Sequence, residues 1–119
     1  VQFFAPGIPQ VYYVGRLAGK NDLKLLEETK VGRNINRHYY TKEEIDAEVK
    51  RPVVAELLRM MEFRNAHPAF DGTFELENSD DDKLVIVRRN GDAWAKLSAD
   101  FKAKKFEITY TEDGEVRAF

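Results

Sequence analysis

The sequence predicts an α+β fold, in which a few helices precede a small antiparallel β-domain of about five strands. Residues 41–66 repeat apolar side chains at helical spacing, and residues 70–119 alternate apolar and polar side chains between turn signals. Residues 1–40 combine an apolar run with glycine and proline. At 119 residues, one independent globular domain is the ceiling.

The opening segment contains a nearly continuous apolar run, within which Gln10 to Val14 is typical of a strand buried on both faces. Such a strand belongs to a parallel sheet, and no other segment of the chain supplies a parallel neighbour. The first residue is Val1, and no basic stretch precedes an apolar one, which favours a processed or truncated end over a signal peptide. We therefore expect the sequence to be a fragment whose first forty residues are rearranged, disordered or self-associated.

Two consecutive helices are predicted in the central zone. Thr41 and Glu44 have the S/T-x-x-E spacing of a capping box, which starts a helix at about Lys42. Pro52 cannot lie within a helix, so we expect it to begin the second one. This second helix has an apolar stripe from Val54 to Met61, and His67-Pro68 ends it.

The last zone predicts an antiparallel meander. Apolar residues alternate with polar ones, and the dipeptides Asn90-Gly91 and Asp113-Gly114 are typical of two-residue hairpin turns. Residues 78–82, which include Asn78 and three consecutive aspartates, indicate a solvated turn. A calcium loop is the alternative there, but the glycine and distal glutamate of an EF-hand loop are missing.

Composition excludes several classes of function. Nineteen Lys and Arg against twenty-one Asp and Glu give a net charge of −2, so no electrostatic attraction to nucleic acid or to an anionic membrane is expected. No apolar run approaches the roughly 18 residues that span a bilayer. The absence of cysteine removes disulfides and thiolate chemistry and fits a cytoplasmic location. His38 and His67 cannot form a metal site without carboxylates, so no metal is expected.

Four stretches closely resemble the C-terminal quarter of bacterial sucrose phosphorylases, which are retaining (β/α)8-barrel enzymes of the α-amylase clan. These stretches are Phe3 to Gly15, Leu17 to Asp22, Gly32 to Tyr40 and Lys50 to Val54. The resemblance extends through Gly72 and then fades to a shared pattern of short strands. It implies that the chain begins with a remnant of the last β/α unit of the barrel.

The resemblance also implies a domain division. Residues 1–68 would be the end of the catalytic barrel, with Gln10 to Val14 as the eighth strand, residues 15–40 as an active-site loop and residues 52–66 as the eighth helix. Residues 69–119 would be the C-terminal β-domain. The catalytic nucleophile and the acid/base carboxylate of the family lie on earlier barrel strands, so no catalytic residue is expected in this chain.

Family members transfer the glucosyl group of sucrose to inorganic phosphate with retention, through a covalent glucosyl-enzyme. The resemblance implies sucrose and phosphate as substrates of the parent enzyme, no cofactor, and a homodimer as one oligomeric state to consider. In the family motif Gly-Arg-Asp/Asn-Ile-Asn-Arg, the first arginine is here Arg33, which would bind the glucosyl unit. Its guanidinium offers five fixed donors and keeps its charge. Asn34 replaces an aspartate of other members.

For several other polar and aromatic residues, the sequence allows both a structural and a functional interpretation. Arg37 is expected to form ion pairs and His38 to cap or pack, although both could bind phosphate. Tyr12 and Tyr13 are expected in the core rather than as sugar platforms, and Trp94 as a packing residue rather than a carbohydrate-binding one. The carboxylate pairs are expected on helix surfaces: Glu27-Glu28 and Glu43-Glu44.

Two further functions stay open at this point. The first is a free-standing carbohydrate-binding or interaction module, which would have no use for residues 2–15. The second is a phosphorylase that acts on sucrose 6'-phosphate or glucosylglycerate.

Overall fold

The computed structural model describes residues 1–77 and 79–119 and has the predicted α+β composition. The described residues form two compact units. One unit combines residues 1–9 with residues 62–119, and the other consists of residues 10–61. The predicted domain boundary after residue 68 concerns the parent protein and stays a prediction. Asn78, within the predicted solvated turn, lies outside the described residues.

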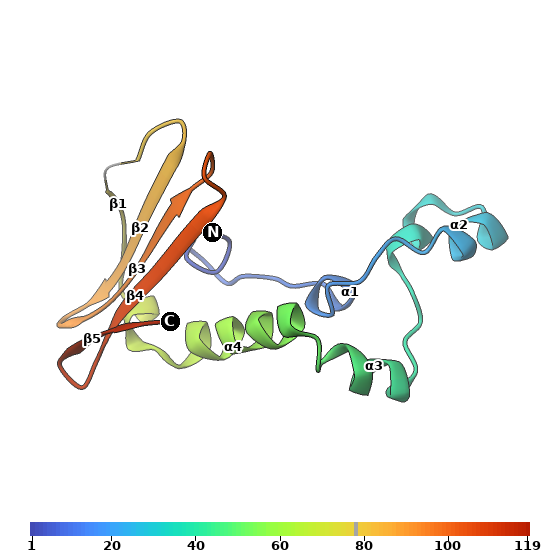
Figure 1. Cartoon of the computed structure of the whole chain (residues 1–119), viewed down its shortest axis with the longest axis horizontal. Helices are drawn as coiled ribbons and strands as arrows, with labels where there is room; N and C mark the ends of the chain where they lie inside the picture. The colour runs from blue at the N-terminus through green and yellow to red at the C-terminus, as the bar shows by residue number, and fades with distance from the viewer. Residues whose placement is uncertain (78) are drawn as a thin grey trace. The chain divides into compact units, whose positions relative to one another are not determined.

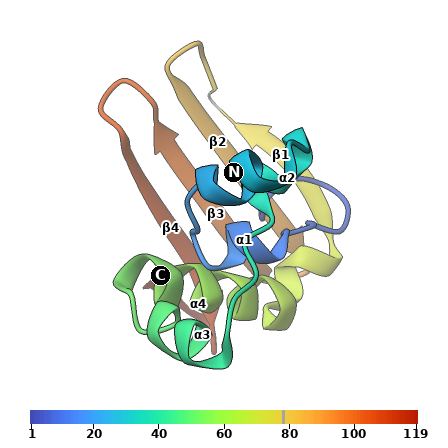
Figure 2. The same ribbon diagram turned by 90° about the vertical axis from the view of Figure 1, so that its right-hand side faces the viewer.

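The first unit is built on a five-stranded antiparallel sheet whose strands follow one another in chain order, as predicted (Figure 1). Figure 2 shows β1 to β4 side by side from a second direction. The strands are β1 (Thr73–Glu77), β2 (Lys83–Asn90), β3 (Ala93–Asp100), β4 (Lys105–Glu112) and β5 (Glu115–Ala118).

Both predicted hairpin turns are present, one of them displaced by a residue. Asp113 and Gly114 connect β4 to β5 as predicted, and both have positive φ. Between β2 and β3 the loop consists of Gly91 and Asp92, because Asn90 still pairs with Ala93. Gly91 has a φ of +58°, which glycine adopts without strain.

A central part of the core of this unit lies on one face of the sheet. Ile86, Leu97 and Ile108 are direct neighbours across β2, β3 and β4, and at most 5% of each is exposed. Phe70, from the 3-10 helix η2 (Pro68–Asp71), is also buried. Phe4 packs edge-to-face on Phe70 with ring centroids 5.1 Å apart.

A buried arginine connects this sheet to η2. The Arg88 guanidinium is 5% exposed and donates hydrogen bonds to the carbonyl oxygens of Phe70 (2.8 Å) and Gly72 (3.2 Å). Gly72 is needed there because a Cβ would lie 1.8 Å from the carbonyl oxygen of Arg89. The path of the chain from η2 into β1 is thereby fixed.

The second unit is helical. It contains α1 (Tyr13–Arg16), α2 (Leu23–Thr29), the 3-10 helix η1 (Gly32–Asn36) and α3 (Lys42–Glu48). Helix α4 (Pro52–Ala66) begins in this unit and ends in the first one.

The predicted helix limits are confirmed. The Thr41 hydroxyl accepts a hydrogen bond from the Glu44 backbone N–H, and the Glu44 carboxylate accepts one from the Thr41 N–H. Pro52 is the first residue of α4, and the helix ends immediately before His67-Pro68.

The predicted strand over Gln10 to Val14 is not formed. Residues 10–12 have no regular structure, and α1 begins at Tyr13. Tyr12 and Tyr13 are 46% and 42% exposed in this chain, and their core position on a barrel strand of the parent enzyme stays a prediction. A lone strand has no partner for its backbone N–H and C=O groups, whereas a helical turn satisfies some of them locally. The barrel remnant is therefore not observed in this structure.

Among the first forty residues, which were expected to be rearranged, disordered or self-associated, Phe4 has a packing partner within the chain. Its side chain is 1% exposed and packs against Phe70 of the β-domain unit. A buried aromatic side chain stabilises a fold mainly by removing apolar area from water. Phe4 is thus part of the core that includes the sheet.

Replacing Phe4 by alanine should destabilise the chain strongly. Phe4→Ala creates a cavity beside Phe70 and should lower the free energy of unfolding by about 3–5 kcal/mol. Urea unfolding followed by circular dichroism measures this change.

The matched control is Phe106→Ala on β4, since Phe106 is 72% exposed. It should cost less than about 1 kcal/mol. Equal losses in the two variants would contradict the packing of Phe4.

Candidate functional site

The loop that contains Arg33 is organised around Asp22. The Asp22 carboxylate caps α2, since its Oδ1 accepts a hydrogen bond from the Leu25 N–H at 2.9 Å. The Asp22 backbone N–H donates to the carbonyl oxygen of Ile35 at 2.6 Å. One residue therefore holds both the start of α2 and the end of η1.

A second bond joins η1 to the other end of α2. The Asn34 side-chain amide donates to the Thr29 hydroxyl at 3.0 Å. Thr29 in turn donates to the carbonyl oxygen of Leu25 at 2.7 Å. Lys30, with a φ of +53°, ends α2 and turns the chain toward η1.

Arg33 lies on η1, and its side chain is exposed. Within residues 1–77 and 79–119 it has no hydrogen-bond or ion-pair partner. Its neighbours Asn34 and Ile35 carry the bonds that hold η1. The guanidinium is therefore presented to solvent on a backbone that is fixed on its C-terminal side.

His38 connects the loop to α3. Its Nδ1 lies 2.8 Å from Asp22 Oδ2, and its Nε2 lies 3.4 Å from Glu44 Oε1. The Tyr40 ring packs edge-to-face on the imidazole at 4.6 Å, and the Tyr13 hydroxyl donates to the His38 carbonyl oxygen at 3.1 Å. His38 thus packs and forms ion pairs, in agreement with the structural reading.

These contacts shift three pKa values. The hydrogen bond that the His38 imidazole donates to the Asp22 carboxylate is the main cause that raises the pKa of His38 above its ordinary value. The backbone N–H of Leu25, followed by the His38 side chain, lowers the pKa of Asp22. The backbone N–H of Thr41 is the main cause that lowers the pKa of Glu44. The directions of these shifts favour the charged forms of both carboxylates and the protonated form of His38.

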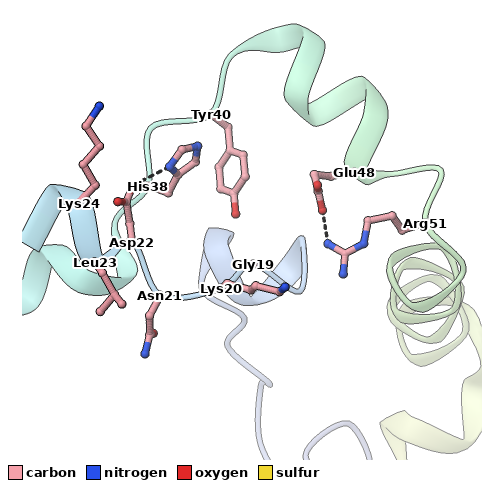
Figure 3. A pocket seen from close by; sticks show the side chains of 10 residues that line it. All are labelled: Gly19, Lys20, Asn21, Asp22, Leu23, Lys24, His38, Tyr40, Glu48 and Arg51. Atoms are coloured by element: carbon pink, nitrogen blue, oxygen red, sulfur yellow. Dashed lines mark hydrogen bonds and ion pairs between the residues drawn. The ribbon is translucent and has the colours of Figure 1, made fainter.

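A cleft of about 720 Å³ opens beside this cluster (Figure 3). In Figure 3 the Asp22 carboxylate points toward the imidazole of His38, and Glu48 faces Arg51. Ten residues line the cleft: Gly19, Lys20, Asn21, Asp22, Leu23, Lys24, His38, Tyr40, Glu48 and Arg51.

The carboxylates of this cleft are already engaged in ion pairs. Asp22 pairs with His38, and Glu48 pairs with Arg51, which also donates to the carbonyl oxygen of Leu17 at 3.4 Å. Arg33 does not line the cleft. The cleft therefore offers polar groups for binding and no unpaired carboxylate for acid/base catalysis.

The remaining candidates form no hydrogen bond or ion pair with Asp22, His38 or Glu44 among the described residues. Arg37 was expected to form ion pairs, but it has none with the residues that the structure describes. Glu28 pairs with Lys24 on the surface of α2 at 3.8 Å. Trp94 is half-buried on β3, where its backbone N–H donates to the Thr111 hydroxyl at 2.9 Å.

The sequence reasoning missed Asp22. Its signal was local, since an aspartate that directly precedes an apolar helical stretch is a typical N-cap. Its pairing with His38 spans 16 residues and has no such signal.

The described part of the chain shows no group of three or more His, Asp or Glu side chains arranged to hold a metal ion. Among the same residues, no helix combines the length and the apolar character needed to cross a bilayer.

No family model matches the chain, but individual proteins are similar over nearly all of it. A sucrose phosphorylase from Streptococcus mutans is 52% identical over 100% of the chain, and a glucosylglycerol phosphorylase from Marinobacter adhaerens is 50% identical over 98%. The chain spans 25% of the length of each of these relatives.

A solved structure is similar as well. The crystal structure of sucrose 6F-phosphate phosphorylase from Thermoanaerobacter thermosaccharolyticum matches with a TM-score of 0.95 and 44% identity. The match covers 99% of this chain and 24% of that protein.

The Asp22 carboxylate should determine the titration of His38. In the 119-residue chain, the imidazole should titrate above its ordinary pKa of about 6.5. Asp22→Asn keeps an oxygen that can cap α2 but removes the charge, so the midpoint should fall. The stabilisation that the Asp22–His38 ion pair gives to the folded chain is fully present below the ordinary pKa of His38. It is lost as the pH rises through the raised pKa of the folded state.

Proton NMR titration of the imidazole signals measures this midpoint. Asp46→Asn on the exposed surface of α3 is the control and should leave the midpoint unchanged. An unchanged midpoint in Asp22→Asn would show that the ion pair does not form in solution.

Proposed function

Because the chain belongs to the family of bacterial sucrose phosphorylases and related phosphorylases, we propose that it forms the C-terminal quarter of such an enzyme. The observation that carries this proposal is identity of about one half to these proteins over nearly the whole chain. The match to a solved phosphorylase structure over 99% of the chain supports it.

The parent enzyme would transfer the glucosyl group of sucrose to inorganic phosphate with retention. In the first step an aspartate attacks the anomeric carbon, and fructose leaves with a proton from a glutamic acid. In the second step phosphate attacks the same carbon, the bond to the aspartate breaks, and the glutamate removes the proton of the nucleophile. Neither of these two residues is proposed in this chain, and no cofactor is needed.

Arg33 would bind the glucosyl unit together with a carboxylate from the rest of the parent enzyme. Two features of the loop support this role. The guanidinium is exposed and unpartnered within the described residues, and bonds from Asp22 and Thr29 hold η1. Five donors in one plane can contact a carboxylate and sugar hydroxyls at the same time.

The activities for which the relatives are named support a glucosyl-binding role. The similar proteins are phosphorylases of sucrose, of glucosylglycerol and of sucrose 6(F)-phosphate. These compounds differ in the leaving group and share a glucosyl unit. A loop common to all of them is therefore best suited to bind the shared unit, and sucrose is our proposed donor.

Three other properties of the parent enzyme remain predictions. The absence of cysteine favours a cytoplasmic location. The balanced charge favours neither nucleic acid nor a membrane as a partner. The third property is the oligomeric state, for which a homodimer is the prediction, and sedimentation of the complete enzyme tests it.

The isolated chain should have no phosphorylase activity. Double displacement cannot proceed without its nucleophile and its acid, so the purified fragment with sucrose and phosphate should release no glucose 1-phosphate. A coupled enzymatic assay for glucose 1-phosphate measures this, with the complete enzyme as the positive control. Turnover by a clean fragment would contradict the proposed division of residues.

Arg33→Ala in the complete enzyme should weaken the glucosyl-binding subsite. Loss of a charge-assisted partner costs about 2–5 kcal/mol in kcat/KM, and part of this loss should appear in kcat because the sugar changes position. Arg33→Lys should recover little, since an ammonium group lacks the planar fork.

Steady-state kinetics with sucrose measure both variants. Arg89→Ala, at an exposed position of β2, is the control and should retain kcat/KM. A near-normal kcat/KM in Arg33→Ala would remove Arg33 from the site.

A further inference from the structure

The Arg33 side chain has no hydrogen bond or ion pair within the described residues, so the bonds of neighbouring residues help to decide where it lies. Ile35 accepts from the Asp22 N–H at 2.6 Å, and Asn34 donates to Thr29 at 3.0 Å. Both bonds connect η1 to α2. The position of Arg33 therefore depends on how α2 is held.

No side chain of helix α2 is fully buried, and polar contacts hold both of its ends. At the N-terminal end the two oxygens of Asp22 have separate roles. Oδ1 caps the helix through Leu25 N–H, and Oδ2 binds His38 Nδ1 at 2.8 Å. The Asp22–His38 pair is thus the polar contact that joins the start of α2 to the segment after η1.

Glu44 extends this connection to α3. Its Oε1 lies 3.4 Å from His38 Nε2, and its Oε2 accepts from the Thr41 N–H at 2.7 Å. Like Asp22, Glu44 uses one oxygen to cap a helix and the other to face the imidazole. His38 therefore lies between the capped starts of two helices.

The two contacts of His38 need its protonated form. A neutral imidazole has one N–H donor, whereas an imidazolium donates from both nitrogens to acceptors such as ionised carboxylates. The titratable groups that face His38 are Asp22 on α2, Glu44 on α3, and Tyr40, whose ring packs on the imidazole. The carboxylates outnumber the imidazole, which favours its protonation.

We propose that Asp22, His38 and Glu44 form a pH-dependent clamp that positions η1, and with it Arg33, for binding of the glucosyl unit. The three are positioning residues, and this role rests on the proposed function of Arg33. Below the pKa of His38 the clamp has both ion pairs. Above it, one of the two contacts is lost and α2 is held less firmly to α3.

The 119-residue chain tests the clamp without any activity. Backbone amide signals of residues 32–36 are followed by NMR as the pH is raised. They should shift with the midpoint of the His38 imidazole, because η1 responds to loss of the clamp. Glu44→Gln should lower this midpoint, and Glu43→Gln, at an exposed neighbouring position of α3, should leave it unchanged. The proposal would be overturned if the amide signals of η1 did not shift at the midpoint of the His38 titration.

The complete enzyme tests the consequence for substrate binding. Glu44→Gln should raise the KM for sucrose about two- to fivefold, as expected for a partly exposed ion pair, with little change in kcat. In the pH profile of kcat/KM, the decline of Glu44→Gln at alkaline pH should begin at a lower pH than that of the parent enzyme. Glu44→Asp should partly restore the parent profile. Glu43→Gln should match the parent enzyme.

The outcomes separate the clamp from the proposed function. If Arg33→Ala lowers kcat/KM but Glu44→Gln leaves the pH profile unchanged, the clamp is wrong and the role of Arg33 stands. If the amide signals of η1 follow His38 while Arg33→Ala is fully active, the coupling within the loop exists and the substrate-binding part of the proposal is overturned.

Discussion

The ion pair between Asp22 and His38 is the contact on which the arrangement of the candidate loop depends. No residue of helices α2, η1 and α3 is fully buried, and polar contacts join these elements to one another. Asp22 instead combines a helix cap, a backbone bond to Ile35 and the pair with His38. Such a loop responds to pH and charge in a way that an apolar core does not.

The unit that contains the sheet is stabilised differently. Ile86, Leu97 and Ile108 form a continuous apolar row across three strands, and Phe4 with Phe70 extends it beyond the sheet. Burial of these side chains stabilises the unit by removing apolar area from water, and this contribution does not depend on charge. One chain thus combines an apolar scaffold with a polar loop that presents Arg33.

Much of this structure could be predicted from the sequence where the signal is local. The capping box of Thr41 and Glu44, the helix start at Pro52 and the turn at Asp113-Gly114 each depend on residues close together in the chain. The strand over Gln10 to Val14 is not formed in this chain, because a strand exists only beside a hydrogen-bonded neighbour. The contacts of Asp22 with His38 and of Phe4 with Phe70 join distant residues, so no local pattern revealed them.

The central claim is that this chain supplies a sugar-binding arginine to a phosphorylase whose catalytic carboxylates lie elsewhere in the protein. A crystal structure of the complete enzyme with bound glucose tests it most directly. We expect the Arg33 guanidinium within hydrogen-bond distance of a glucosyl hydroxyl, at about 2.7–3.2 Å, with Asp22 still bound to His38. A bound glucose with Arg33 facing solvent away from it would contradict the account.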